Sequence, residues 1–294
     1  MNKQKTREAR CSGLSGFYED MTINRQHKHR NQQGRPNVLV LMTDQQRWDS
    51  LGVYGCDFAH TPNLDRLGRE GAVFDNCYIN NPICTPSRAS MLTGKHLPGH
   101  GVYRLYDVLP ETEKLFTCHL QDLGYTTALF GKLHVSAKDY EHYERHPHDG
   151  FDVFEPCMEG CLRMDSPNQA YAQWLRENHP EFHDRLAENL RNELHHPRSV
   201  HMTHWAAERT IDFLKRQDGE QPFFCMMSIF DPHDPYEDYP LEMESLVDRA
   251  CIPDPVVDEQ PLSGKPSAVQ REHHGSYMGD FANYSLDDLR AMGK

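Results

Sequence analysis

Three apolar runs along the chain have the pattern of buried β-strands. Residues 37–42 (NVLVLM), 125–130 (YTTALF) and 223–230 (FFCMMSIF) are short, uncharged and rich in β-branched or aromatic side chains. Continuous apolar runs of this length are typical of strands that are covered on both faces. Polar residues follow each run, so we expect each strand to end there.

Segments between these runs predict helices. Residues 61–70 and 85–93 both begin with Thr-Pro and end before a glycine, which are helix start and stop signals. Residues 112–123 also end before a glycine, and residues 203–217 repeat apolar side chains on one helical face. Strands that alternate with helices predict an α/β fold with a mainly parallel central sheet and helices on both faces.

The remaining segments are polar. Residues 1–35 hold eight Lys and Arg residues against three acidic ones, and we expect a disordered basic tail. The folded domain is expected over 36–294, with a His-rich helical insertion at 160–200 and a loop-rich stretch at 236–282.

Charge and hydropathy limit the partners. The net charge of −13 argues against nucleic acid as a partner, and the apolar runs are too short to cross a bilayer. The first ten residues, MNKQKTREAR, lack the apolar core of a secretory signal. We therefore expect a cytoplasmic protein without a membrane partner.

Polar side chains follow all three predicted strands. Asp44 comes after the first, Lys132 and His134 after the second, and His233 after the third. Each could be a turn, cap or solvated residue by itself. In parallel sheets, however, ligands bind beyond the carboxyl ends of the strands, so their shared placement predicts a site.

Cys84 stands just before the helix expected at 85–93. The free N–H groups and dipole of a helix start favour an anion, and Arg88, one turn later, adds a cation. A thiol there could be a nucleophile. The plainer interpretations are a buried thiol and a surface arginine.

Residues 84–94 (CTPSRASMLTG) resemble the C-x-P-S-R-x-x-x-L-T-G signature of the sulfatases. Residues 37–44, 61–67, 124–134 and 224–235 resemble further segments of that family, in the same order. The resemblance implies an alkaline-phosphatase-like fold, of which this chain is the N-terminal portion and which is C-terminally incomplete.

The resemblance also implies how such a site works. Cys84 would be oxidised to formylglycine by a formylglycine-generating enzyme, and its hydrate would attack the sulfur of a small-molecule sulfate ester. Asp44, together with the modified Cys84, would hold a divalent cation, with Ca²⁺ expected first and Mn²⁺ as the alternative.

Four further residues receive roles by the same resemblance. Arg88 would position the hydrated aldehyde, and Lys132 would bind both it and the sulfate. His134 would accept a proton when sulfate is released, and His233 would contact the sulfate or protonate the leaving oxygen.

The sequence departs from the family pattern at two places. Gln45 follows Asp44, whereas many sulfatases have a second Asp, and no later Asp-His or Asp-Asn ligand segment is found. We therefore expect too few cation ligands, an unpaired sheet edge with exposed apolar surface, and impaired sulfate-ester hydrolysis by this chain alone. The alternatives are a phosphonate or phosphodiester hydrolase of the same superfamily and a non-catalytic remnant.

Overall fold

The computed structural model describes residues 34–158, 163–188, 195–234, 236, 238–253 and 264–275. These residues form two compact units. The main unit holds residues 34–48 and the described part of 71–243, and the small unit holds 49–70, 244–253 and 264–275. Nearly all of the tail predicted at 1–35 lies outside the described residues.

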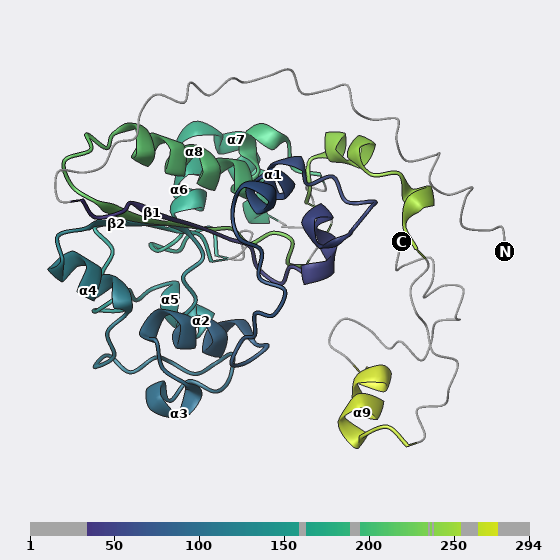
Figure 1. The fold of residues 1–294 in the computed structure, drawn as a ribbon, viewed down its shortest axis with the longest axis horizontal. Coiled ribbons are helices and arrows are strands. Elements are labelled where there is room, and N and C mark those ends of the chain that lie inside the picture. Colours follow the sequence, from purple (N-terminus) through teal and green to yellow (C-terminus); the bar gives the residue numbers. More distant parts are fainter. Residues whose placement is uncertain are drawn as a thin grey trace. The chain divides into compact units, whose positions relative to one another are not determined.

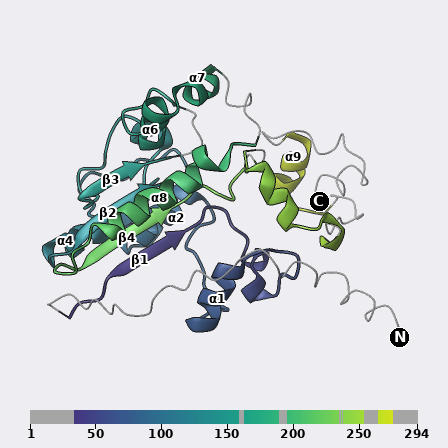
Figure 2. The same cartoon turned by 90° about the horizontal axis from the view of Figure 1, so that it is seen from above.

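The main unit is built on a four-stranded parallel sheet with the order β1-β4-β2-β3 (Figure 2). Its strands are β1 (Val38–Met42), β2 (Thr126–Gly131), β3 (Val153–Pro156) and β4 (Phe223–Ser228). Its helices are α2 (Cys84–Thr93), α3 (Leu97–His100), α4 (Phe116–Asp122), α5 (Lys138–Glu141), α6 (Ala170–Asn178), α7 (Pro180–Glu188) and α8 (Met202–Lys215). The predicted parallel α/β fold is confirmed.

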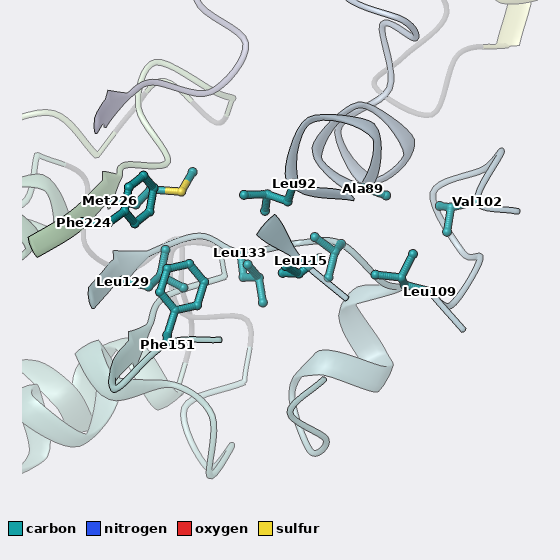
Figure 3. Packing of buried hydrophobic residues seen from close by; sticks show 11 residues of the cluster. Ala89, Leu92, Val102, Leu109, Leu115, Leu129, Leu133, Phe151, Phe224 and Met226 are labelled. Carbon is teal, nitrogen blue, oxygen red and sulfur yellow. The ribbon is translucent and has the colours of Figure 1, made fainter. Parts of the chain in front are cut away.

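Helices cover both faces of the sheet. Figure 1 shows α6, α7 and α8 on one side and α2, α4 and α5 on the other. The core beneath α2 joins Leu92 of that helix to Leu129 of β2 and to Phe224 and Met226 of β4 (Figure 3). All four side chains are at most 3% exposed. Burial of such side chains stabilises the fold by roughly 1.5–3 kcal/mol each.

Strand β1 is an edge of the described sheet. It pairs only with β4 among the described strands, and Leu39 and Leu41 are 44% and 55% exposed. An open edge with exposed leucines is the feature that the sequence predicted for this sheet.

Strand β3 was not predicted. It has four half-buried residues, one of them Glu155, so it lacks the apolar run that marked the other strands. Arg209 of α8 donates to both oxygens of Glu155, at 2.6 and 2.7 Å. Such a bidentate ion pair compensates the charge within the strand, and this pairing depends on tertiary structure.

The helical region predicted at 160–200 contains α6 and α7. These helices bury Tyr171, Leu175, Phe182 and Leu186 in a core with α8. The described part of this predicted insertion therefore contributes to the packed core. No helix in the described part of the chain has the length and apolarity to cross a membrane.

The small unit contains α1 (Pro62–Glu70), α9 (Ser267–Gly275) and the short 3-10 helices Gly52–Tyr54 and Arg249–Cys251. Helix α1 starts where its Thr-Pro signal predicts. Asp65 accepts from the N–H of Val53 at 2.8 Å and from the hydroxyl of Thr61 at 3.0 Å. The side chains in and before its first turn thus tie this helix to the preceding loop. Helix α9 lies within the stretch expected to be rich in loops.

Gly131, the last residue of β2, is expected to tolerate no side chain. Its φ is +106°, and an added Cβ would lie 1.9 Å from the carbonyl oxygen of Ser228. We expect Gly131→Ala to lower the free energy of unfolding by about 3 kcal/mol, measured by urea denaturation. Gly124→Ala is the control, since its φ of +81° is also positive but an added Cβ would meet only Arg35, at 4.0 Å. Equal losses in the two variants would contradict the steric argument.

Candidate active site

The carboxyl ends of the strands bring the predicted polar residues to one edge of the sheet. The backbone N–H of Asp44 donates to Asp231 at 3.2 Å, which joins the loops after β1 and β4. The N–H of Lys132 donates to the carbonyl of Ser228 at 2.7 Å, which joins the ends of β2 and β4. The close approach at Gly131 permits this second bond. Backbone hydrogen bonds thus bring Asp44 and Lys132 to the same edge of the sheet.

Asp44, Lys132 and Arg88 form a buried charge cluster. Oδ2 of Asp44 lies 2.5 Å from Nζ of Lys132 and 3.5 Å from Nη2 of Arg88, and the three side chains are at most 9% exposed. Burial by itself would raise the pKa of Asp44, but Lys132 and Arg88 together lower it below its ordinary value. Two cations surround one carboxylate, so the cluster has a net positive charge that favours an anion.

Arg88 is held rigidly in this cluster. Its Nη1 donates to the carbonyl of Lys132 at 2.8 Å and to Oγ of Ser228 at 3.0 Å, and the residue is 2% exposed. Burial lowers the pKa of Arg88, although a guanidinium stays protonated in proteins. The surface-arginine interpretation is wrong, because this side chain crosses the core to reach two strand ends.

Cys84 is the first residue of α2 and is half-buried. Ile83, at the N-cap, offers no side-chain acceptor, so the cap leaves the first N–H groups of the helix without a side-chain partner. Arg88 follows Cys84 by four residues in α2, so the two side chains lie on the same face of this helix. Burial lowers the pKa of Arg88, and the charges of Asp44 and of a Cys84 thiolate oppose that shift. The site therefore offers helix N–H groups and a fixed cation beside this sulfur.

His134 is buried next to the cluster in a backbone conformation with a φ of +55°. Burial, followed by the charges of Lys132 and Arg88, lowers its pKa to about 2. Its Nε2 lies 3.1 Å from Oγ1 of Thr85, the residue after Cys84. The imidazole is therefore neutral at ordinary pH and close to the start of α2.

Glu141 holds the backbone around His134, and no motif in the sequence points to it. Its two carboxylate oxygens accept from the N–H groups of His134 at 2.9 Å and Ser136 at 2.7 Å. Burial raises the pKa of Glu141 to about 7, although these hydrogen bonds oppose the shift. The contact depends on α5, a four-residue helix that no periodicity marks.

His233 lies in the loop after β4, at the same edge. Its N–H donates to Phe230 at 3.1 Å, its ring stacks on the Phe230 ring with 4.5 Å between centroids, and its Nδ1 is 2.7 Å from the carbonyl of Asp234. The Nζ of Lys132 lies 5.1 Å from the centroid of the same Phe230 ring. The loop is thus more than a plain turn, because Phe230 connects His233 to the cluster.

The described residues do not by themselves suit a hard dication. Asp44 offers one carboxylate, which is already paired with Lys132, and Gln45, with a φ of +56°, is exposed. Calcium prefers six to eight oxygen ligands in proteins. The part of the chain that the structure describes provides one wall of such a site and not a complete ligand shell.

Comparison with known proteins agrees with this geometry. Residues 36–263 match the sequence model of the Sulfatase family. The chain belongs to the sulfatase family. An arylsulfatase of Clostridium perfringens is 32% identical over 235 residues, which are 76% of this chain and 49% of that protein. Human N-acetylgalactosamine-6-sulfatase is 31% identical over 215 residues, covering 68% of this chain and 40% of that enzyme. This sulfatase chain therefore spans less than half the length of these relatives.

A solved structure shares the fold of this sulfatase chain. The phosphonate monoester hydrolase of Agrobacterium radiobacter superposes with a TM-score of 0.57 at 25% identity, covering 72% of this chain and 44% of that one. The predicted alkaline-phosphatase-like fold is thereby confirmed. Membership of the family implies a divalent cation and a formylglycine.

Proposed function

We propose that this chain carries the nucleophile and the anion-binding wall of a sulfatase active site that hydrolyses sulfate esters. The observation that supports this most directly is the Asp44–Lys132–Arg88 cluster beside Cys84 at the start of α2. Two buried cations and uncapped helix N–H groups provide the environment that a sulfate group needs. The sulfatase relatives support the sulfate ester as substrate.

Each of the site residues would have its own role in the hydrolysis. Oxidised to formylglycine, position 84 supplies a hydrated aldehyde as the nucleophile toward sulfur. Arg88 positions this hydrated aldehyde, and Lys132 binds both it and the sulfate. His134 is neutral before the substrate binds, and the negative charge of a bound sulfate raises its pKa, so its capacity to accept a proton increases once the site is filled.

The remaining cation ligands are proposed to lie in the half of the sulfatase domain that this chain does not cover. Asp44 would contribute one carboxylate to a Ca²⁺ site, and Gln45 one amide oxygen. The shortage of oxygen ligands among the described residues motivates this proposal, and it predicts that the 294 residues alone hydrolyse sulfate esters poorly.

The test is co-expression with a formylglycine-generating enzyme, followed by hydrazide labelling and an aryl sulfate assay with Ca²⁺. We expect an aldehyde at position 84. The Cys84→Ala variant should lose labelling, and turnover should fall below about one thousandth of the wild-type rate. Cys118→Ala is the matched control, because it removes another half-buried thiol, which lies in α4 and contacts the carbonyl of His148 instead of the charge cluster.

The assay must include a version extended at its C-terminus to the length of the Clostridium relative. If position 84 is converted and the folded, extended protein cleaves no aryl sulfate, the proposal is wrong. Labelling that persists in Cys84→Ala would also contradict it, because the aldehyde would then lie elsewhere.

A second candidate is hydrolysis of phosphonate monoesters or phosphodiesters. The Asp44-Gln45 pair and the fold shared with a phosphonate monoester hydrolase favour it. The rates of the extended protein on matched aryl sulfate and aryl phosphonate esters decide between the two, and a strong preference for sulfate excludes the phosphonate reaction.

A further inference from the structure

A second group of metal-ligand side chains lies outside the cluster around Asp44. One ligand atom from each of His201, Asp231 and Asp238 lies within 4.8 Å of the other two. His201 caps the N-terminus of α8, Asp231 lies in the loop after β4, and Asp238 follows a few residues later. His201 is 5% exposed, and both aspartates are half-buried.

Two electron-rich atoms face each other in this group. Nδ1 of His201 accepts from the N–H of Thr203 at 3.2 Å, so this nitrogen carries a lone pair and not the proton, and a cation bound there would take the place of the Thr203 N–H. The same Nδ1 is 3.8 Å from Oδ2 of Asp231, which accepts from the Thr203 hydroxyl. The proton of the neutral ring is then on Nε2, which is buried and has no hydrogen-bond partner among the described residues.

The spacing suits one bound cation. Zinc binds imidazole nitrogen and carboxylate oxygen at about 2.0–2.2 Å in a tetrahedral arrangement, so two of its ligands lie about 3.3–3.6 Å apart. Nδ1 and Oδ2 lie 3.8 Å apart, so a small approach of the two side chains brings them to this spacing. The backbone N–H of His196 donates to the carbonyl of Asp238 at 3.0 Å, which holds the third residue beside the first two.

We propose that His201, Asp231 and Asp238 bind a second dication, of the class that combines imidazole with carboxylate ligands, such as Zn²⁺. This donor set differs from the oxygen-rich shell that Ca²⁺ prefers.

The site has a direct connection to the active-site edge. The carbonyl of Asp231 accepts from the N–H of Asp44, and His233 follows two residues later. A cation on the Asp231 carboxylate therefore restrains the loop that carries His233. The role is one of positioning, because the connection to the Asp44–Lys132–Arg88 cluster runs through the backbone carbonyl of Asp231.

The test measures Zn²⁺ binding by equilibrium dialysis of the 294-residue chain, with Ca²⁺ in excess to occupy hard-cation sites. Two variants remove ligands. Asp238→Asn neutralises a half-buried carboxylate, and His201→Asn removes the imidazole but keeps a good N-cap acceptor for α8. We expect each variant to bind one equivalent of Zn²⁺ less, or to bind it at least about tenfold more weakly.

Two controls separate this site from others. Asp44→Asn should keep the Zn²⁺ equivalent, because Asp44 belongs to the other cluster. His183→Asn should keep it too, since His183 pairs with Asp184 at 3.0 Å but has no second carboxylate in the described group. Circular dichroism confirms that each variant is folded. Equal Zn²⁺ binding by wild type, Asp238→Asn and His201→Asn would overturn the proposal, and this readout is independent of sulfate-ester turnover.

Discussion

Replacing Arg88 with methionine is expected to lower the free energy of unfolding by about 3 kcal/mol or more. The guanidinium satisfies the carbonyl of Lys132 and the hydroxyl of Ser228 inside the core, and it lies 3.5 Å from the Asp44 carboxylate. Methionine fills part of the volume but donates no hydrogen bond, so these buried acceptors lose their partner. Urea denaturation at pH 7, followed by circular dichroism, measures the loss.

The matched control for this substitution is Arg104→Met. Arg104 also pairs with a carboxylate, that of Asp107 at 2.8 Å, but its side chain is 79% exposed. Water replaces such a partner readily, so we expect little change in stability. A loss in Arg88→Met no larger than that in Arg104→Met would show that the buried network does not stabilise the fold. Arg88→Lys should lose about as much stability as Arg88→Met. A lysine ammonium lacks the planar fork of the guanidinium, so it cannot donate to both strand ends at once.

The strand ends explain why much of the site could be predicted from the sequence. Asp44, Lys132 and His134 each follow an apolar run, and parallel pairing with β4 brings those runs into register. The sequence pattern therefore predicted which residues share an edge. It did not predict that Lys132 pairs directly with Asp44, because that contact depends on the order of the strands.

Contacts made by irregular segments could not be predicted in this way. Glu141 reaches the backbone of His134 from a four-residue helix, and Glu155 lies in a strand without an apolar run. Glu141 is buried and Glu155 is half-buried in the sheet, at positions where a sequence pattern predicts apolar residues. Their compensating partners come from other elements, so only the folded chain reveals them.

His134 and Glu141 affect the pH dependence of stability in opposite directions. The pKa of His134 is lowered from its ordinary 6.5 to about 2. Its contribution to the free energy of unfolding is therefore present above pH 6.5 and is lost as the pH falls. The pKa of Glu141 is raised from its ordinary 4.5 to about 7, so its contribution is present below pH 4.5 and is lost as the pH rises through 7. Between pH 4.5 and 6.5 the folded chain holds a proton on Glu141 and the unfolded chain holds one on His134.

Glu141→Gln is therefore expected to make the protein acid-sensitive in this window. In the wild type, the proton that Glu141 holds in the folded chain offsets the proton that His134 holds in the unfolded chain. The pair therefore adds almost nothing to the slope of the free energy of unfolding against pH between 4.5 and 6.5. The variant keeps only the His134 contribution, so the free energy of unfolding should fall by about 1.4 kcal/mol for each unit of decreasing pH. Urea denaturation at half-unit pH intervals measures this slope relative to the wild type.

The opposite substitution gives the sharper comparison. His134→Gln keeps only the Glu141 contribution, so stability relative to the wild type should rise as the pH falls from 6.5 to 4.5, with a slope of similar size and reversed sign. The double variant should again match the wild-type slope, because neither buried group then titrates. Surface carboxylates titrate alike in all four proteins and cancel from the comparison. Parallel curves for the two single variants would mean that burial and the charges of Lys132 and Arg88 do not keep His134 neutral. His134 could not then serve as a proton acceptor that the bound sulfate activates.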